Sequence, residues 1–202
     1  MKYPNNYVVW DLETTGFSFT DNKIIEIGAM IVENEEVVGT FEKLLNHGIE
    51  IPEEITKLTG ISEKDLKEKG EDPRKTFLDF FEVLKSSEMN ITHNGFKFDI
   101  PFLVESLRPL LKEEELIEFR KKMYSQSLDT AVLYKARKLE KQRLWNQSFG
   151  DFAKEVMNIR AYGVKFNVGI ACEELGIDKS KVTQHRAIGD VELTHEIFKK
   201  IK

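Results

Sequence analysis

Residues 7–16 read Tyr7-Val8-Val9-Trp10-Asp11-Leu12-Glu13-Thr14-Thr15-Gly16, an apolar run that leads into two acids. Its β-branched and aromatic residues predict a strand over 7–12. Residues two apart on a strand face the same side, so Asp11 and Glu13 are expected to project together. Neighbouring carboxylates repel unless a cation lies between them, and hard oxygen ligands select magnesium or manganese over zinc. The alternative is a solvent-facing strand end whose acids need no metal. The turn that Gly16 permits favours a ligand.

Further strands and helices extend outward from this run. The segments 24–33 and 37–45 continue it as an antiparallel meander, because a turn-like run separates them. After residue 52 the pattern becomes helical. We predict a strand over 89–93 and helices over 53–58, 74–86, 100–111, 127–139, 167–175 and 187–201. Strand alternating with helix adds parallel strands to a sheet, so the sequence predicts the α/β class.

A second motif, His93-Asn94-Gly95-Phe96-Lys97-Phe98-Asp99, ends in an acid just before Pro101. Capping alone explains an aspartate at the start of a predicted helix, and Asn94 and Gly95 also suit a turn. The other interpretation places Asp99 with the first two acids in one site. The motif by itself leaves both interpretations open.

The third motif is His185-Arg186-Ala187-Ile188-Gly189-Asp190. On one regular helix His185 and Asp190 would point about 140° apart. If both serve one site, His185 must therefore lie on the loop before the helix and Asp190 on its first turns. A histidine beside a metal site can act as a general base toward water. The alternative is an exposed loop histidine and a surface aspartate.

Composition sets the broad class. The 202 residues fit one domain with an ordered, aromatic-rich insertion at about 141–166. We find no signal peptide and no membrane span, and the single Cys172 forms no intramolecular disulfide, so a cytoplasmic location is expected. The net charge of −5 argues against a broad basic surface for duplex nucleic acid, but not against a short contact neutralised by bound cations.

Other catalytic constellations are missing from the sequence. His47, His93 and His195 are interpreted as structural, and no pair of histidines has zinc-like spacing. Walker and dinucleotide loops and the nucleophile-elbow pattern are absent. A basic run leads into the insertion and has two interpretations, a track for a phosphate backbone or a solvated helix face: Lys135, Arg137, Lys138, Lys141 and Arg143.

In this order the three motifs resemble the DEDDh branch of the DnaQ-like 3′-to-5′ exonucleases, which includes polymerase III proofreading exonucleases, RNase T and oligoribonuclease. The first is similar to Asp-x-Glu-Thr-Thr-Gly, and the third matches His-x-Ala-x-x-Asp. The second resembles His-Asn-x-x-Phe-Asp but has one residue more. Three further stretches are similar to family segments and extend the likeness over nearly the whole chain: Ile24 to Ala29, Leu58 to Ile61 and Leu128 to Thr130.

The resemblance implies a ribonuclease H-like fold, with a mixed five-stranded sheet flanked by helices. It also implies that Asp11, Glu13, Asp99 and Asp190 hold two Mg²⁺ or Mn²⁺ ions and that His185 is the general base. The implied substrate is a 3′ end, hydrolysed to nucleoside 5′-monophosphates. The residues expected to contact that end are Thr14, Thr15, Phe17 and Asn94, although packing in the core is an equal alternative for Phe17.

Several functions stay open. The first is an exonuclease on the 3′ end of single-stranded DNA, and the second is the same reaction on RNA ends or short oligoribonucleotides. The strand meander favours a polymerase-associated type, but the sequence identifies no protein partner, and no membrane is expected to take part. From another class, the chain could be a catalytically silent nucleic-acid-binding domain or a phosphatase on small nucleotides.

Overall fold

The computed structural model describes residues 3–163, 165–180, 182–183 and 185–202. Its centre is a five-stranded sheet in the order β3-β2-β1-β4-β5. β1 pairs antiparallel with β2 and parallel with β4, and β5 continues the parallel side, so the expected mixed sheet and meander are confirmed. The strands are β1 (Tyr7–Thr14), β2 (Ile24–Glu33), β3 (Glu36–Leu44), β4 (Asn90–Thr92) and β5 (Ser127–Asp129).

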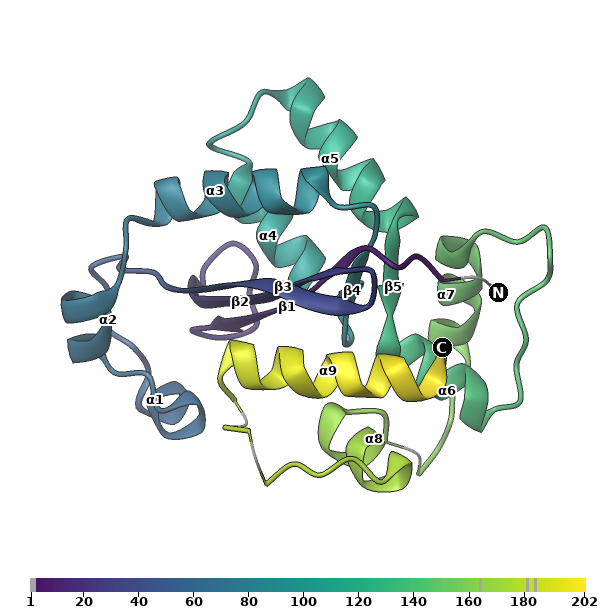
Figure 1. The fold of residues 1–202 in the computed structure, drawn as a ribbon. Helices are drawn as coiled ribbons and strands as arrows, with labels where there is room; N and C mark the ends of the chain where they lie inside the picture. Colours follow the sequence, from purple (N-terminus) through teal and green to yellow (C-terminus); the bar gives the residue numbers. More distant parts are fainter. Residues whose placement is uncertain (1–2, 164, 181, 184) are drawn as a thin grey trace.

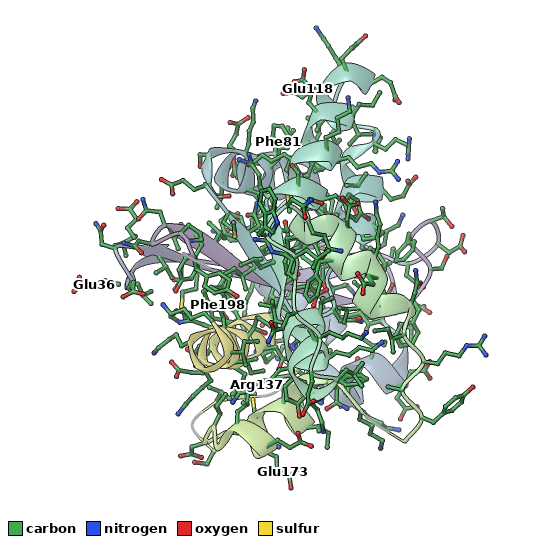
Figure 2. The ribbon with its side chains drawn as sticks, turned by 90° about the vertical axis from the view of Figure 1, so that its right-hand side faces the viewer. Glu36, Phe81, Glu118, Arg137, Glu173 and Phe198 are labelled. Carbon is green, nitrogen blue, oxygen red and sulfur yellow. The ribbon has the colours of Figure 1, made fainter. Side chains whose placement is uncertain are left out.

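Helices cover both faces of this sheet (Figures 1 and 2). α3, α4 and α5 lie on one side, while α9, α6 and α8 lie on the other, and α1 and α2 stand at one end. The helices are α1 (Glu53–Thr59), α2 (Glu63–Lys69), α3 (Pro73–Ser86), α4 (Asp99–Leu107), α5 (Glu113–Ser125), α6 (Thr130–Lys138), α7 (Phe149–Asn158), α8 (Val168–Leu175) and α9 (Ala187–Ile201).

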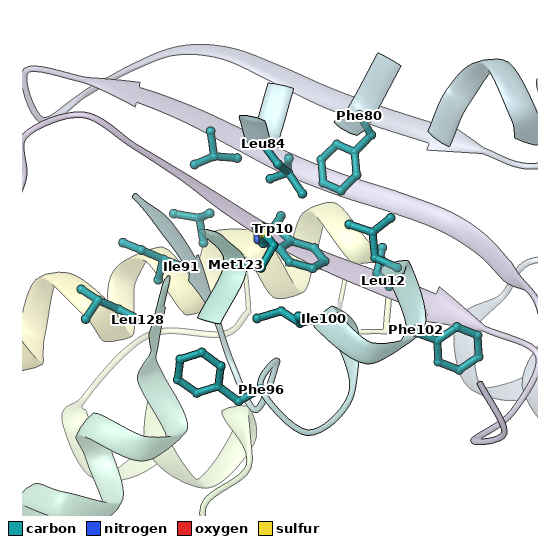
Figure 3. Close-up of a cluster of buried hydrophobic side chains, with 14 of the residues drawn as sticks. Trp10, Leu12, Phe80, Leu84, Ile91, Phe96, Ile100, Phe102, Met123 and Leu128 are labelled. Carbon is teal, nitrogen blue, oxygen red and sulfur yellow. The ribbon is translucent and has the colours of Figure 1, made fainter. Parts of the chain in front are cut away.

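Burial of both sheet faces explains the composition of β1. Tyr7 to Trp10 are all buried, because apolar helices cover the strand from each side. Figure 3 shows Trp10 among side chains of α3, α4 and the parallel strands, with the Phe80 ring centroid 5.6 Å away. Asp11 and Glu13 follow these buried residues on β1, so core packing fixes the backbone that carries the two acids.

The sequence-based elements need three corrections. Residues 127–129 form β5 and not the start of a helix, because they pair with β4 in parallel register and all three are buried. The helix expected over 100–111 ends at Leu107. Three helices were missed, namely α2, α5 and α7. Gly60 and Gly176 end α1 and α8 in the left-handed conformation, with φ of 72° and 66°.

The segment 141–166 divides into core and surface parts. Phe149 and Phe152 of α7 are buried in the same apolar cluster as the sheet residues. Trp145 and Tyr162 instead lie on the surface, with 93% and 85% of their area exposed. Order in this segment therefore comes from α7 and from Phe166, which packs against Tyr134, whereas the exposed Trp145 and Tyr162 do not contribute to it.

The basic run before this segment makes internal contacts. Lys135 Nζ donates to the Ile159 carbonyl (2.7 Å), Lys138 pairs with Glu174 (2.7 Å), and Arg143 donates to the Gln147 carbonyl (2.6 Å). The two lysines fasten α6 to its neighbours, while the Arg143 contact is local to the loop that follows α6; neither earlier interpretation of the run anticipated these contacts. Among the described helices, none is both long and apolar enough to cross a membrane.

Candidate active site

Two acids of the site come from β1. Asp11 and Glu13 project from the same side of the strand and are both partly exposed, whereas Leu12 between them is buried. Their partners on β2 are Gly28 and Glu26, and the pairing register shifts just after Glu13. The alternation of the strand thus places both carboxylates on one face, as expected from the sequence.

Asp190 joins them from the first turn of α9. This helix packs across β1 and β2, and its start lies against Gly28, where an added Cβ would lie 2.5 Å from the Ala187 carbonyl carbon. One carboxylate oxygen each of Asp11, Glu13 and Asp190 lies within 4.8 Å of the others. The first and third motifs therefore meet at one point of the described structure.

Asp99 is the first residue of α4 and is buried. It does not cap the helix, because Phe98 holds the N-cap position and no side chain caps the helix. Burial raises the pKa of Asp99, and a hydrogen bond from the Leu12 backbone offsets part of that rise; the Asp99 charge in turn adds to the rise that burial causes in the pKa of Asp11 and Glu13. The second motif is thus next to the first, although Asp99 is outside the three-acid cluster.

Crowding of these acids shifts their titration. Burial raises the pKa of Asp11 well above its usual range, and repulsion from Asp99, Asp190, Glu13 and Glu26 adds to the shift. Burial, followed by the charges of neighbouring acids, raises the pKa of Glu13 to about 8, and burial raises that of Asp99 to about 7.

The pKa of Asp190 is raised as well, chiefly by burial. A hard divalent cation would relieve this repulsion, and the donor set is entirely carboxylate oxygen. The residues present therefore fit magnesium or manganese.

His185 lies outside α9, as the spacing required. It sits on the turn before the helix with a left-handed φ of 59°, and it is exposed. Its backbone N–H donates to Asp190 Oδ2 over 3.1 Å, which ties the turn to the acid. His185 and Asp190 both line a cleft of about 660 Å³, whose other lining residues are His93, Asn94, Ala131, Phe166, Asn167, Val168 and Gly169.

The opposite wall of this cleft is held by His93. The buried His93 ring places Nε2 2.8 Å from the Phe166 carbonyl oxygen and Nδ1 2.8 Å from Thr130 Oγ1. Asn94 is exposed at the cleft with a φ of 66°. His47 contacts the Ile24 carbonyl, and His195 contacts the Tyr7 hydroxyl. Contacts within the protein therefore account for His47, His93 and His195.

The side chains expected to contact the substrate differ in whether they are already engaged in contacts within the protein. Thr14 Oγ1 donates to the Gly16 carbonyl (2.7 Å), and Thr15 Oγ1 accepts from the Lys23 N–H (2.9 Å), so both hydroxyls serve the turn. Phe17 is 85% exposed, which excludes core packing, and its ring lies 6.0 Å from that of Phe98. Of these three residues, Phe17 presents the free side chain.

Two buried carboxylates beside the site were not identified from the sequence. Asp129 accepts backbone N–H groups of Asn94 and Phe96 (2.9 and 3.3 Å) and holds the loop that leads to Asp99. Glu26 accepts from Arg186 and from the Ala187 N–H at the start of α9. Both residues lie in stretches that are similar to family segments, and this similarity was the only feature of the sequence that pointed to them. The residues around them in the sequence reveal neither their burial nor their hydrogen-bond partners.

Comparison with known proteins points to nucleases. A family model described as Exonuclease matches residues 8–198. The DNA polymerase III PolC-type of Clostridium perfringens is 30% identical over 204 residues, covering 99% of this chain and 12% of that protein. The PolC-type polymerase of Caldanaerobacter subterraneus is 39% identical over 106 residues, covering 52% of this chain and 7% of the length of that polymerase. The chain thus spans only a small part of these relatives.

Solved structures show the same fold. A structure of exonuclease I aligns with a TM-score of 0.75 at 16% identity, covering 98% of this chain and 41% of the other. E. coli exonuclease I in complex with a dA16 oligonucleotide aligns with a TM-score of 0.74 at 15% identity, covering 98% and 40%. The expected ribonuclease H-like fold is confirmed by this likeness and by the mixed five-stranded sheet.

Proposed function

This chain belongs to the exonuclease family of DnaQ-like proteins, and we propose that it hydrolyses single-stranded nucleic acid from the 3′ end, releasing nucleoside 5′-monophosphates. The observation that carries the proposal is the meeting of Asp11, Glu13 and Asp190 within 4.8 Å, beside a cleft that His185 lines. A silent binding domain has no need of such mutually repelling acids.

In this proposal Asp11, Glu13, Asp99 and Asp190 hold two divalent ions, Mg²⁺ or Mn²⁺. Bound there, such ions would supply the means to activate water and to stabilise the charge that develops on the leaving oxygen. His185 accepts the proton of the attacking water at an imidazole nitrogen, for which its exposed turn beside Asp190 gives room. Phe17 stacks on the terminal base, while the backbone at Thr14 and Thr15 and the side chain of Asn94 contact the terminal nucleotide.

We propose DNA as the favoured substrate. Support comes from the PolC-type polymerases among the relatives and from the exonuclease I structure that holds a dA16 oligonucleotide. The same relatives suggest a polymerase as partner. RNA ends or short oligoribonucleotides are the alternative, because the cleft has polar groups that a 2′-hydroxyl can meet, including the exposed Asn94.

The test uses end-labelled DNA and RNA of matched sequence with magnesium or manganese. We expect a ladder that shortens from the 3′ end, with DNA degraded faster than RNA. A faster RNA ladder would make the alternative the function. No shortening of either strand, combined with binding to both, would establish a silent binding domain, and hydrolysis of free nucleotides alone would establish a phosphatase.

A further inference from the structure

Glu26 is a buried carboxylate that pairs with Arg186. Its side chain is fully buried on β2, and its cross-strand neighbour on β1 is Glu13. Arg186 Nε donates to both of its oxygens (2.9 and 3.2 Å), and Arg186 Nη2 donates to Oε1 (2.5 Å). Burying an ion pair of this kind is costly unless its hydrogen bonds are satisfied, as they are here.

The same carboxylate also replaces the missing cap of α9. The first backbone N–H groups of a helix have no partner within it, and no side chain caps α9. Glu26 Oε2 accepts the Ala187 N–H over 2.8 Å, so a neighbouring strand satisfies this amide. Glu26 thus holds both the last residue before α9 and the first residue of α9.

These contacts fall between the two functional residues of the third motif. Arg186 follows His185 directly, and Asp190 lies one turn further on, with its Oδ2 bonded to the His185 N–H. Nearby, Gly28 lets the helix start approach the sheet. Movement of Arg186 would therefore displace His185 and Asp190 together.

We propose that Glu26, acting through Arg186 and the Ala187 amide, is a positioning residue that sets where His185 and Asp190 stand relative to the acids of β1. Arg186 also pairs with a carboxylate whose charge would otherwise face Glu13 unopposed across the two strands. The fork of the guanidinium makes arginine, and not lysine, suited to this place. The proposal rests on the proposed function.

The first test replaces Glu26 by glutamine, which keeps its volume and removes its charge. We expect the Glu26→Gln variant to lower turnover on a short single strand by about 10- to 100-fold, as loss of a supporting contact to a site ligand does, while affinity for the strand in calcium changes less than about twofold. The matched control is Glu42→Gln, since Glu42 lies 3.7 Å from the same guanidinium but is half-exposed. It should keep turnover within about twofold.

The second test is the pair of Arg186→Gln with Glu26→Gln. Residues that act as one unit are not additive, so the double variant should be no slower than the slower single variant. A double variant that loses the product of both single effects would contradict the proposal, as would a Glu26→Gln variant with parental turnover.

A readout without metal or substrate separates this proposal from the function. Hydrogen exchange of the backbone amides over 185–190 in the metal-free protein should be faster in Glu26→Gln and unchanged in Glu42→Gln. Unchanged exchange in Glu26→Gln would overturn the positioning role even if the parent is an active exonuclease. If the parent hydrolyses nothing but exchange is still faster in Glu26→Gln than in the parent, the positioning contact stands and only the proposed function is rejected.

Discussion

At the scale of residues, His185 separates a hydrolase from a protein that only binds metal. Because a general base acts in the transition state, His185→Ala should lower turnover by about 10²- to 10⁴-fold, with little change in single-strand affinity in calcium. Turnover is measured under single-turnover conditions, so that product release does not mask chemistry. His47→Ala is the matched control, since His47 contacts the Ile24 carbonyl elsewhere. Parental turnover in His185→Ala would remove the base from the account.

Which site residues the sequence could predict depends on distance along the chain. Asp11 and Glu13 share a face because side chains two apart on a strand point to the same side. His185 was expected outside the helix because residues five apart on a helix, such as His185 and Asp190, point in different directions. That Asp99 and Asp190 lie beside the first pair was implied only by the family resemblance. Their approach depends on β4 pairing beside β1 and on α9 crossing the sheet, which no local pattern encodes.

At the scale of elements, the seat of α9 on β2 decides the geometry of the site. Gly28→Val would place side-chain atoms against the backbone of Ala187 and Ile188, since a Cβ alone would lie 2.5 and 2.6 Å from their atoms. We expect a loss of about 1–3 kcal/mol of stability and a larger fractional loss of turnover, because Asp190 and His185 move with the helix start.

Thermal melts and turnover of Gly28→Val are compared with Gly39→Val on β3. There the nearest atom to an added Cβ, Ile31 Cδ1, is 3.7 Å away, so little change is expected. Equal turnover losses in both variants would show that the contact between α9 and Gly28 does not control the geometry of the site.

Element prediction failed where an element is defined by contacts that are distant in the chain. β4 was predicted although it has only three residues, but β5, equally short, runs directly into α6, and only its pairing with β4 separates it from the helical pattern that follows. The long strands β1 and β2 were predicted well, because apolar runs of this length bounded by turn residues have few other structures. The resemblance supplied the fifth strand that periodicity did not.

At the scale of the whole molecule, the crowded acids link stability to pH. The pKa of Glu13 rises from 4.5 to about 8 on folding and that of Asp99 from 3.8 to about 7. Between these values the folded chain binds more protons than the unfolded chain. Metal-free stability should therefore fall as pH rises from about 6.5 to about 8, above the range in which His47, His93 and His195, whose pKa burial lowers, still take up protons, at about 2–4 °C of melting temperature for each kcal/mol lost.

Magnesium should reverse this trend, because binding to the folded chain alone stabilises it. Glu13→Gln supplies the control, since removal of one acid should flatten the pH dependence. Melting temperatures measured over this range, with and without magnesium, check both statements. A metal-free melting temperature that rises steadily with pH would mean that the acids do not repel one another as the structure indicates.

We propose that these acids form a metal-dependent site for removing nucleotides from a 3′ end. Single-turnover cleavage of one single strand, labelled at its 5′ end or at its 3′ end, by the parent and by Asp190→Asn tests this proposal directly. We expect the 3′ label to leave first as a mononucleotide while the 5′ label descends a ladder, and we expect excess chelator or Asp190→Asn to abolish both. Release of the 5′ label first, internal cuts, or undiminished cleavage in chelator would contradict it.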